Sequence, residues 1–128
     1  MLSLPVSTRY FLYRHETDMR KGFDGLSGLI RNELQKDPLS GDVFIFFNKR
    51  HNQVKLLLWE RDGFSIYYKR LEKGTYELPL LNDSMLSAEL RSEELMLILQ
   101  GISLESIRRR KRFHFGENKL VNTKTSSP

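Results

Sequence analysis

Residues 43–70 have the sequence VFIFFNKRHNQVKLLLWERDGFSIYYKR, and this stretch decides the fold. It begins with five consecutive apolar residues, Val43–Phe47, a pattern typical of a strand covered on both faces. A polar loop separates this run from a second apolar segment, Val54–Trp59. Arg61-Asp62-Gly63 then predicts a tight hairpin turn into Phe64–Lys69, because Asp-Gly supports positive φ angles. The stretch therefore predicts three antiparallel strands in sequence.

Shorter strands are predicted on both sides of these three. Arg9–Arg14 is rich in aromatic residues that alternate between two faces, which is typical of a strand. Beyond a turn at Gly74, Thr75–Leu78 is predicted as a short fourth strand and Met85–Leu90 as an edge strand. The sheet is therefore expected to have four or five strands.

A helix is predicted between the first strand and the central three. Asp18 is its expected N-cap, and Asp37-Pro38 ends it, because the residue before a proline is forced out of the α region. Its apolar residues recur at helical spacing along one stripe: Met19, Phe23, Leu26, Ile30 and Leu34.

Three glycines, Gly22, Gly25 and Gly28, lie within this predicted helix. Each costs about 1 kcal/mol relative to alanine in a helix interior. The favoured explanation is that the helix packs tightly on its sheet or begins later than Asp18. The alternative is that a phosphate or another backbone approaches this face.

A short helix is predicted near the end of the domain, with Ser92 as its cap, Glu93 and Glu94 in its first turn and Gly101 just past its end. Its apolar side is formed by Leu95, Ile98 and Leu99. Ser103–Arg112 is predicted as a further short helix. Together these elements predict one α+β domain over residues 1–102, an antiparallel sheet (meander) with one main helix and a short C-terminal helical segment. Residues 103–128 are expected to form a basic, partly disordered tail.

Composition limits the class of protein. The 128 residues suit one domain, and Leu, Ile, Val and Phe make up roughly 30% of them, enough to form a core. The chain has no cysteine, which excludes disulfides, thiol nucleophiles and cysteine-ligated zinc. No apolar run has the length of a membrane span, and Met1–Pro5 does not resemble a signal peptide. A cytoplasmic location without a membrane partner is therefore expected.

The net charge of +5 is concentrated in the tail. Residues 1–100 carry 14 Lys and Arg against 14 Asp and Glu, whereas residues 101–128 carry 7 against 2. Five consecutive cations, Arg108, Arg109, Arg110, Lys111 and Arg112, are followed closely by Phe113 and Phe115. Cations neutralise phosphates and aromatic rings stack on bases, so this run favours nucleic-acid binding. An acidic protein partner, or a solvated tail without a specific partner, remains open.

Three further basic pairs are candidate nucleic-acid contacts: Arg20-Lys21, Lys49-Arg50 and Lys69-Arg70. Acidic residues are interleaved with them, so an ordinary charged surface is the favoured interpretation of these pairs.

The sequence offers no catalytic motif, metal site or cofactor site. No phosphate loop or dinucleotide fingerprint occurs, and His15, His51 and His114 are scattered without ligand spacing. Seven carboxylates are candidates by type for two-metal chemistry, which needs two or three of them to converge: Asp18, Asp24, Asp37, Asp42, Glu60, Asp62 and Glu72. Caps and turns explain several of them, so a metal-dependent nuclease using Asp18 or Asp24 is the least favoured hypothesis.

Residues 18–29, DMRKGFDGLSGL, resemble the signature of TnpB, a transposon accessory protein of insertion sequence family 66. The resemblance covers about residues 9–80, with a looser Leu-rich segment ending at Gly101-Ile102, and departs at His15-Glu16 and in the basic tail. It continues through DPLSG (37–41), VFIF (43–46), KLL (55–57), WERDGF (59–64) and YKRLEKG (68–74). This family is unrelated to the RNA-guided nucleases that share the name, so none of their chemistry is carried over.

The resemblance implies a role and not a reaction. Such proteins look like helpers encoded beside a larger transposase that carries the catalytic carboxylates. No catalytic residues are established for the family, so none are carried over to this chain. The leading hypothesis is a non-catalytic accessory factor that contacts transposon DNA, including its terminal repeats, through Arg108–Arg112. The alternative is a protein adaptor that docks on the element's transposase without significant DNA binding.

Overall fold

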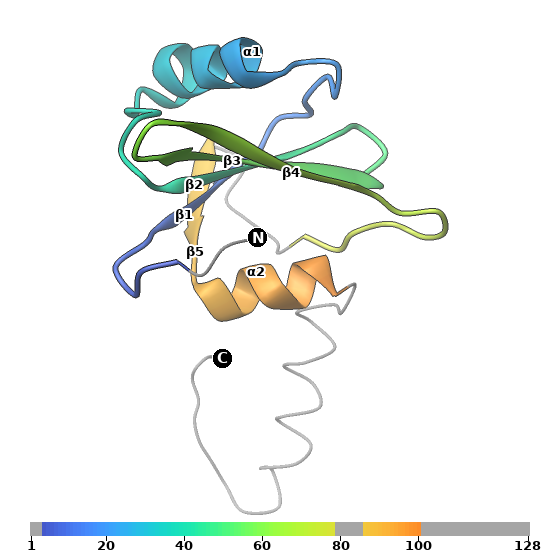
Figure 1. Cartoon of the computed structure of the whole chain (residues 1–128). Helices are drawn as coiled ribbons and strands as arrows, with labels where there is room; N and C mark the ends of the chain where they lie inside the picture. The colour runs from blue at the N-terminus through green and yellow to red at the C-terminus, as the bar shows by residue number, and fades with distance from the viewer. Residues whose placement is uncertain (1–3, 79–85, 101–128) are drawn as a thin grey trace, which may run out of the picture.

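Strand β2 (Val43–Phe47) is the central strand of a five-stranded sheet with the order β4-β3-β2-β1-β5 (Figure 1). The structure is a computed structural model that describes residues 4–78 and 86–100. All five side chains of β2 are buried, which confirms the two-sided burial predicted from its apolar run. β3 (Gln53–Glu60) and β4 (Gly63–Arg70) extend the sheet as an antiparallel meander, as predicted.

The sheet is mixed and not purely antiparallel, because β1 (Tyr10–Tyr13) pairs in parallel with β2. The physical reason is the long connection through the main helix, since a crossover of this kind returns the chain in the same direction. β5 (Ser87–Leu90) pairs antiparallel with β1 and forms the predicted edge strand. The α+β class and the five-strand count are confirmed.

Two local predictions are wrong. Thr75–Leu78 is a loop, in which the Tyr76 N–H donates to the His51 carbonyl at 2.7 Å and the buried Tyr76 ring packs edge-on against Phe47, with 5.4 Å between centroids. The hairpin after β3 is present, but the positive φ belongs to Arg61 (52°) and Gly63 is already the first residue of β4. Gly74 has the expected turn conformation, with a φ of 79°.

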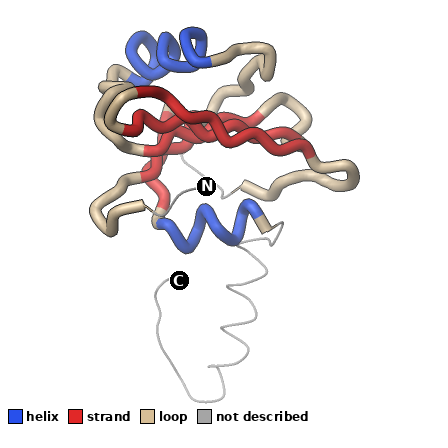
Figure 2. Tube along the Cα trace, viewed as in Figure 1, coloured by secondary structure: helices blue, strands red, loops and turns tan. Residues whose placement is uncertain are grey.

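A helix covers each face of the sheet (Figures 1 and 2). α1 (Phe23–Leu29), continued by the π-helical turn η1 (Ile30–Leu34), lies on one face, and α2 (Ser92–Leu99) lies on the other. The core on the α1 side consists of Phe11, Tyr13, Leu26, Ile30, Phe44, Phe46 and Leu57. The core on the α2 side includes Leu12, Val43, Ile45, Phe47, Val54, Leu56, Leu58, Leu95 and Ile98. The predicted alternation of β1 is thereby confirmed.

α1 begins five residues later than the predicted N-cap. Asp18 instead closes a turn, in which its Oδ1 accepts the Arg20 N–H at 2.9 Å, and the first helical hydrogen bond runs from the Leu26 N–H to the Gly22 carbonyl. Gly22 therefore precedes the helix. A Cβ at Gly25 would meet only the Lys21 side chain, and one at Gly28 would meet nothing within 4 Å. The late start explains Gly22, whereas Gly25 and Gly28 remain inside α1, and the open space around Gly28 shows that packing on the sheet does not require a glycine there.

α2 has the predicted length and apolar side, with Arg91 in the N-cap position in place of Ser92. The Arg91 N–H donates to Glu94 Oε1 at 2.8 Å, which satisfies one free donor at the helix start. The predictions for Gly101, for a helix over Ser103–Arg112 and for a disordered end lie outside the described residues, as does the domain boundary at residue 102. No helix within residues 4–78 and 86–100 is long and apolar enough to cross a membrane.

Candidate nucleic-acid interface

The Lys49-Arg50 pair is presented at the tip of the loop between β2 and β3. The Asn48 side chain organises this loop: its Oδ1 accepts the N–H groups of Asn52 (3.0 Å) and Gln53 (2.9 Å), and its Nδ2 donates to Asn52 Oδ1. The Asn48 carbonyl accepts the His51 N–H at 3.1 Å. Both cations are exposed on a loop whose own polar groups are bonded internally. The loop therefore presents two exposed cations on a backbone that internal hydrogen bonds hold in place.

The Lys69-Arg70 pair lies beside this loop. Arg70 is opposite Gln53 and Lys69 is opposite Val54 in the β3–β4 register, so the end of β4 meets the start of β3 directly after the loop. The Leu71 N–H donates to the Asn52 carbonyl at 2.8 Å and fixes this arrangement. Arg70 makes an exposed ion pair with Glu72 (3.2 Å). We call the group Lys49, Arg50, Lys69 and Arg70 the basic end.

The two ends of the sheet differ in charge. Arg14 and Lys73 join the basic end, because the first follows β1 and the second follows β4, while its nearby carboxylates are Glu16, Glu72 and Glu77. In the described part of the chain, the opposite end carries the cations Arg9, Lys36, Arg61 and Arg91 with the carboxylates Asp42, Glu60, Asp62, Glu89 and Glu94. Among the described residues, cations outnumber carboxylates at the basic end and do not at the opposite end of the same strands.

Arg20-Lys21 lies apart from this end, on the α1 face of the sheet. The Arg20 guanidinium binds the Asp18 carboxylate, with a shortest distance of 2.7 Å, and this hydrogen-bonded partner lowers the pKa of Asp18 from 3.8 to about 2. Arg20 is thus already paired. The segment that carries it crosses the face over Lys55, which is two residues along β3 from Gln53.

Lys55 is the feature that sequence reasoning missed. Its side chain points inward from β3 and is only 8% exposed, and its Nζ donates to the carbonyls of Met19 and Lys21, both at 2.8 Å. The same Nζ lies 4.8 Å from the centroid of the Tyr68 ring. A lysine within the apolar run Val54–Leu58 could have drawn attention to this position, since a buried charge needs partners. It pins the segment before α1 to the sheet.

The carboxylates considered for catalysis take separate places. Asp18 is paired with Arg20, and Asp37 Oδ1 accepts the Leu39 N–H at 2.9 Å. In the part of the chain that the structure describes, no three His, Asp or Glu side chains come together in a way that could hold a metal ion. The run Arg108–Arg112 lies outside that part.

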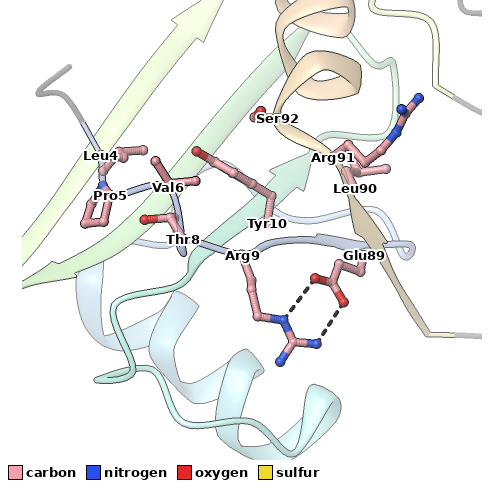
Figure 3. Close-up of a pocket in the computed structure, with 10 residues that line it drawn as sticks. All are labelled: Leu4, Pro5, Val6, Thr8, Arg9, Tyr10, Glu89, Leu90, Arg91 and Ser92. Atoms are coloured by element: carbon pink, nitrogen blue, oxygen red, sulfur yellow. Dashed lines mark hydrogen bonds and ion pairs between the residues drawn. The ribbon is translucent and has the colours of Figure 1, made fainter.

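An open hollow of about 660 Å³ lies at the end of the sheet opposite the basic end (Figure 3). Arg9 and Glu89 form a two-point ion pair across its side, at 2.9 and 2.8 Å. This pairing lowers the pKa of Glu89 and raises that of Arg9, so the charged groups satisfy one another. The remaining lining is Leu4, Pro5, Val6, Thr8, Tyr10, Leu90, Arg91 and Ser92. Of the residues that line the hollow, only Arg9 and Arg91 are cations, and both are ion-paired, with Glu89 and Glu94 respectively.

Comparison with known proteins assigns the chain to a family. The family model described as IS66 Orf2-like protein, TnpB of insertion sequence family 66, matches residues 8–109. The uncharacterized protein y4jC of Sinorhizobium fredii is 29% identical over 102 residues, covering 80% of this chain and 86% of that protein. A second protein of the same strain, y4hO, is 26% identical over 102 residues, covering 80% and 87%. No solved structure matches the chain. The chain therefore belongs to the IS66 Orf2-like (TnpB) family.

Proposed function

We propose that the chain is a non-catalytic accessory protein of insertion-sequence transposition that contacts DNA with the basic end and with Arg108–Arg112. Membership of the IS66 Orf2-like family supports the accessory role. The observation that carries the DNA contact is the β3–β4 register, which sets Lys69 and Arg70 beside the Lys49-Arg50 loop. Four cations from two chain segments are then exposed at one end of the sheet, with Lys69 and Arg70 on opposite faces of β4.

The arrangement suits a phosphate backbone more than base readout. Lysine and arginine side chains on an organised loop and a strand end neutralise phosphates, and this contact carries no sequence information by itself. β3 and β4 are paired as far as Gln53 and Arg70, so the two basic pairs lie at the same end of the sheet and make that end positive. Cations and carboxylates nearly balance at the opposite end, so DNA is attracted mainly to the basic end, which favours one orientation of approach. The five cations Arg108–Arg112 are proposed to add further phosphate contacts.

The test is the salt dependence of DNA binding by the full chain. Fluorescence anisotropy with terminal-repeat DNA of the element and with a scrambled duplex gives the log–log slope of affinity against salt. Each neutralised phosphate contributes about 0.9 to this slope. Lys49→Gln/Arg50→Gln is expected to lower the slope by up to about 1.8, and replacement of the five cations 108–112 by alanine by up to about 4.5.

A matched control removes two cations from the other end. Arg61→Gln/Arg91→Gln makes the same change in net charge and is expected to leave the slope close to that of the wild type. Equal losses in both double variants would show that only net charge matters and would refute the basic end as the contact. If no form binds DNA at low salt, the adaptor hypothesis takes its place. Co-purification with the transposase after nuclease treatment then tests that alternative.

A further inference from the structure

The outer edge of β4 is the longest open edge of the sheet. β4 has eight residues, all paired with β3 without interruption, whereas β5 at the other edge has four. Natural edge strands are usually protected by shortness, proline, charge or a bulge, because an open edge pairs readily with another strand. The centre of β4, Phe64–Tyr68, contains neither proline nor charge. Its length and composition make it suited to pairing.

The pairing groups of this edge can be identified from the register. The Leu71 N–H donates to the Asn52 carbonyl, so the odd-numbered residues of β4 direct their N–H and C=O groups toward β3. Phe64, Ile66, Tyr68 and Arg70 therefore direct theirs outward. Within the described residues, no other segment makes a hydrogen bond to these groups, and the loop after β4 turns under the α2 face, where Leu71 and Tyr76 join the core. The edge is a free template.

Apolar side chains flank this edge on the α1 side. Phe23, at the start of α1, is 48% exposed and stacks on Phe64 with 6.4 Å between ring centroids. Tyr68 is 52% exposed. These rings extend the apolar surface from the helix to the strand edge. An added strand would cover aromatic surface as well as complete hydrogen bonds.

We propose that β4 pairs antiparallel with β4 of a second copy of the chain, with the two-fold axis at Ile66. In this register, Phe64 lies opposite Tyr68 of the second copy, and Asp62 lies opposite its Arg70. The strand is thus complementary to itself in charge and in aromatic pairing. A slip of two residues in one direction sets Asp62 against Glu72, and a slip in the other sets it against Tyr68. The Ile66-centred register is therefore favoured, and the two sheets join into one of ten strands.

The first test compares two substitutions at Tyr68 in the full chain. Tyr68→Pro removes an outward N–H and leaves every main-chain hydrogen bond to β3 in place, whereas Tyr68→Val keeps the N–H. Both variants remove the ring and its hydroxyl contact with Gln53, so the comparison isolates the outward N–H. Sedimentation velocity from about 1 to about 100 µM is expected to give a dimer for the wild type and for Tyr68→Val, and a dissociation constant raised at least about tenfold for Tyr68→Pro. A wild type that stays monomeric throughout overturns the proposal.

The second test fixes the register and does not depend on the proline variant folding. Asp62→Arg and Arg70→Asp alone each place like charges across the axis and are expected to weaken the dimer several-fold, while the double variant restores it. Asp62 lies in the turn before β4 and Arg70 is the last residue of β4, so they are more than about 20 Å apart and cannot compensate within one copy. A double variant weaker than both single variants excludes this register. DNA binding is measured separately, so loss of the dimer and loss of the DNA contact are distinguishable.

Discussion

Replacing Lys55 by methionine tests how the segment before α1 is held. The change keeps the length of the side chain and removes the ammonium that binds the carbonyls of Met19 and Lys21. Hydrogen bonds to a charged group contribute about 1.5–3 kcal/mol each, and a cation near an exposed ring adds about 0.5–1 kcal/mol. Part of this lost stabilisation is offset. The variant no longer has to desolvate an ammonium group, and water can reach the segment that carries the two freed carbonyls.

We expect Lys55→Met to lower the free energy of unfolding by about 2 kcal/mol, corresponding to a fall in melting temperature of about 10 °C for a domain of this size. Circular dichroism melts and urea titrations measure the loss. Hydrogen exchange of the Arg20, Lys21 and Gly22 amides gives the local consequence, which is faster exchange than in the wild type. Lys69→Met is the matched control, since Lys69 is exposed, and it should change stability by less than about 0.5 kcal/mol.

The reasoning is refuted if Lys55→Met is as stable as the wild type and the exchange of residues 20–22 is unchanged. A variant that melts early with unchanged exchange would locate the effect in the core and not in the pinned segment.

Three further predictions concern α1 and the turn before it. Gly28→Ala should raise the stability by about 0.4–1 kcal/mol, because its Cβ enters open space in a helical conformation, and a thermal melt that shows destabilisation contradicts this. Ile30→Ala should cost about 2–5 kcal/mol in a urea titration, because the Ile30 side chain is fully buried. The pKa of Asp18 is about 2 in the fold against an ordinary 3.8, so its contribution is present above 3.8 and is lost as the pH falls through 2. Between these pH values the wild type should lose melting temperature more steeply than Asp18→Asn, and parallel curves would exclude the Asp18–Arg20 pair as a source of acid sensitivity.

The sheet could be predicted wherever the sequence pattern reports burial directly. Val43–Phe47 has no polar residue, because both faces of β2 are covered, and the strand was placed at the same residues. The parallel pairing of β1 with β2 could not be predicted in this way, since it depends on where the crossover helix packs. Thr75–Leu78 has the composition of a strand, but none of the five strands in the described part of the chain pairs with it. The Tyr76 N–H donates to the His51 carbonyl, and the segment remains a loop.

The predicted start of α1 at Asp18 is too early. The apolar residues from Met19 onward do keep a helical spacing, but the main chain before Phe23 makes hydrogen bonds outside the helix. Met19 lies on the predicted apolar stripe, yet its carbonyl and that of Lys21 accept from Lys55 and are therefore not available to a helix. These two hydrogen bonds join residues that are 36 and 34 positions apart in the sequence, so no pattern among neighbouring residues can predict them. For the candidate site, the basic pairs were found from charge alone, but their meeting at one end depends on the β3–β4 register.

The pairing of β1 with β5 has a kinetic consequence. Tyr10 and Leu90 are neighbours in the sheet although 80 positions separate them, whereas the strands β2, β3 and β4 follow one another directly. Closing a long loop costs more chain entropy than closing a short one, and non-local contacts slow folding. The meander of β2, β3 and β4 is therefore expected to form first, and β1 and β5 are expected to add to it later. During synthesis on the ribosome, the sheet cannot be completed until residue 90 has emerged. The pairing of β1 with β5 near the two ends of the domain, and not the apolar centre, therefore sets the time at which the fold is complete.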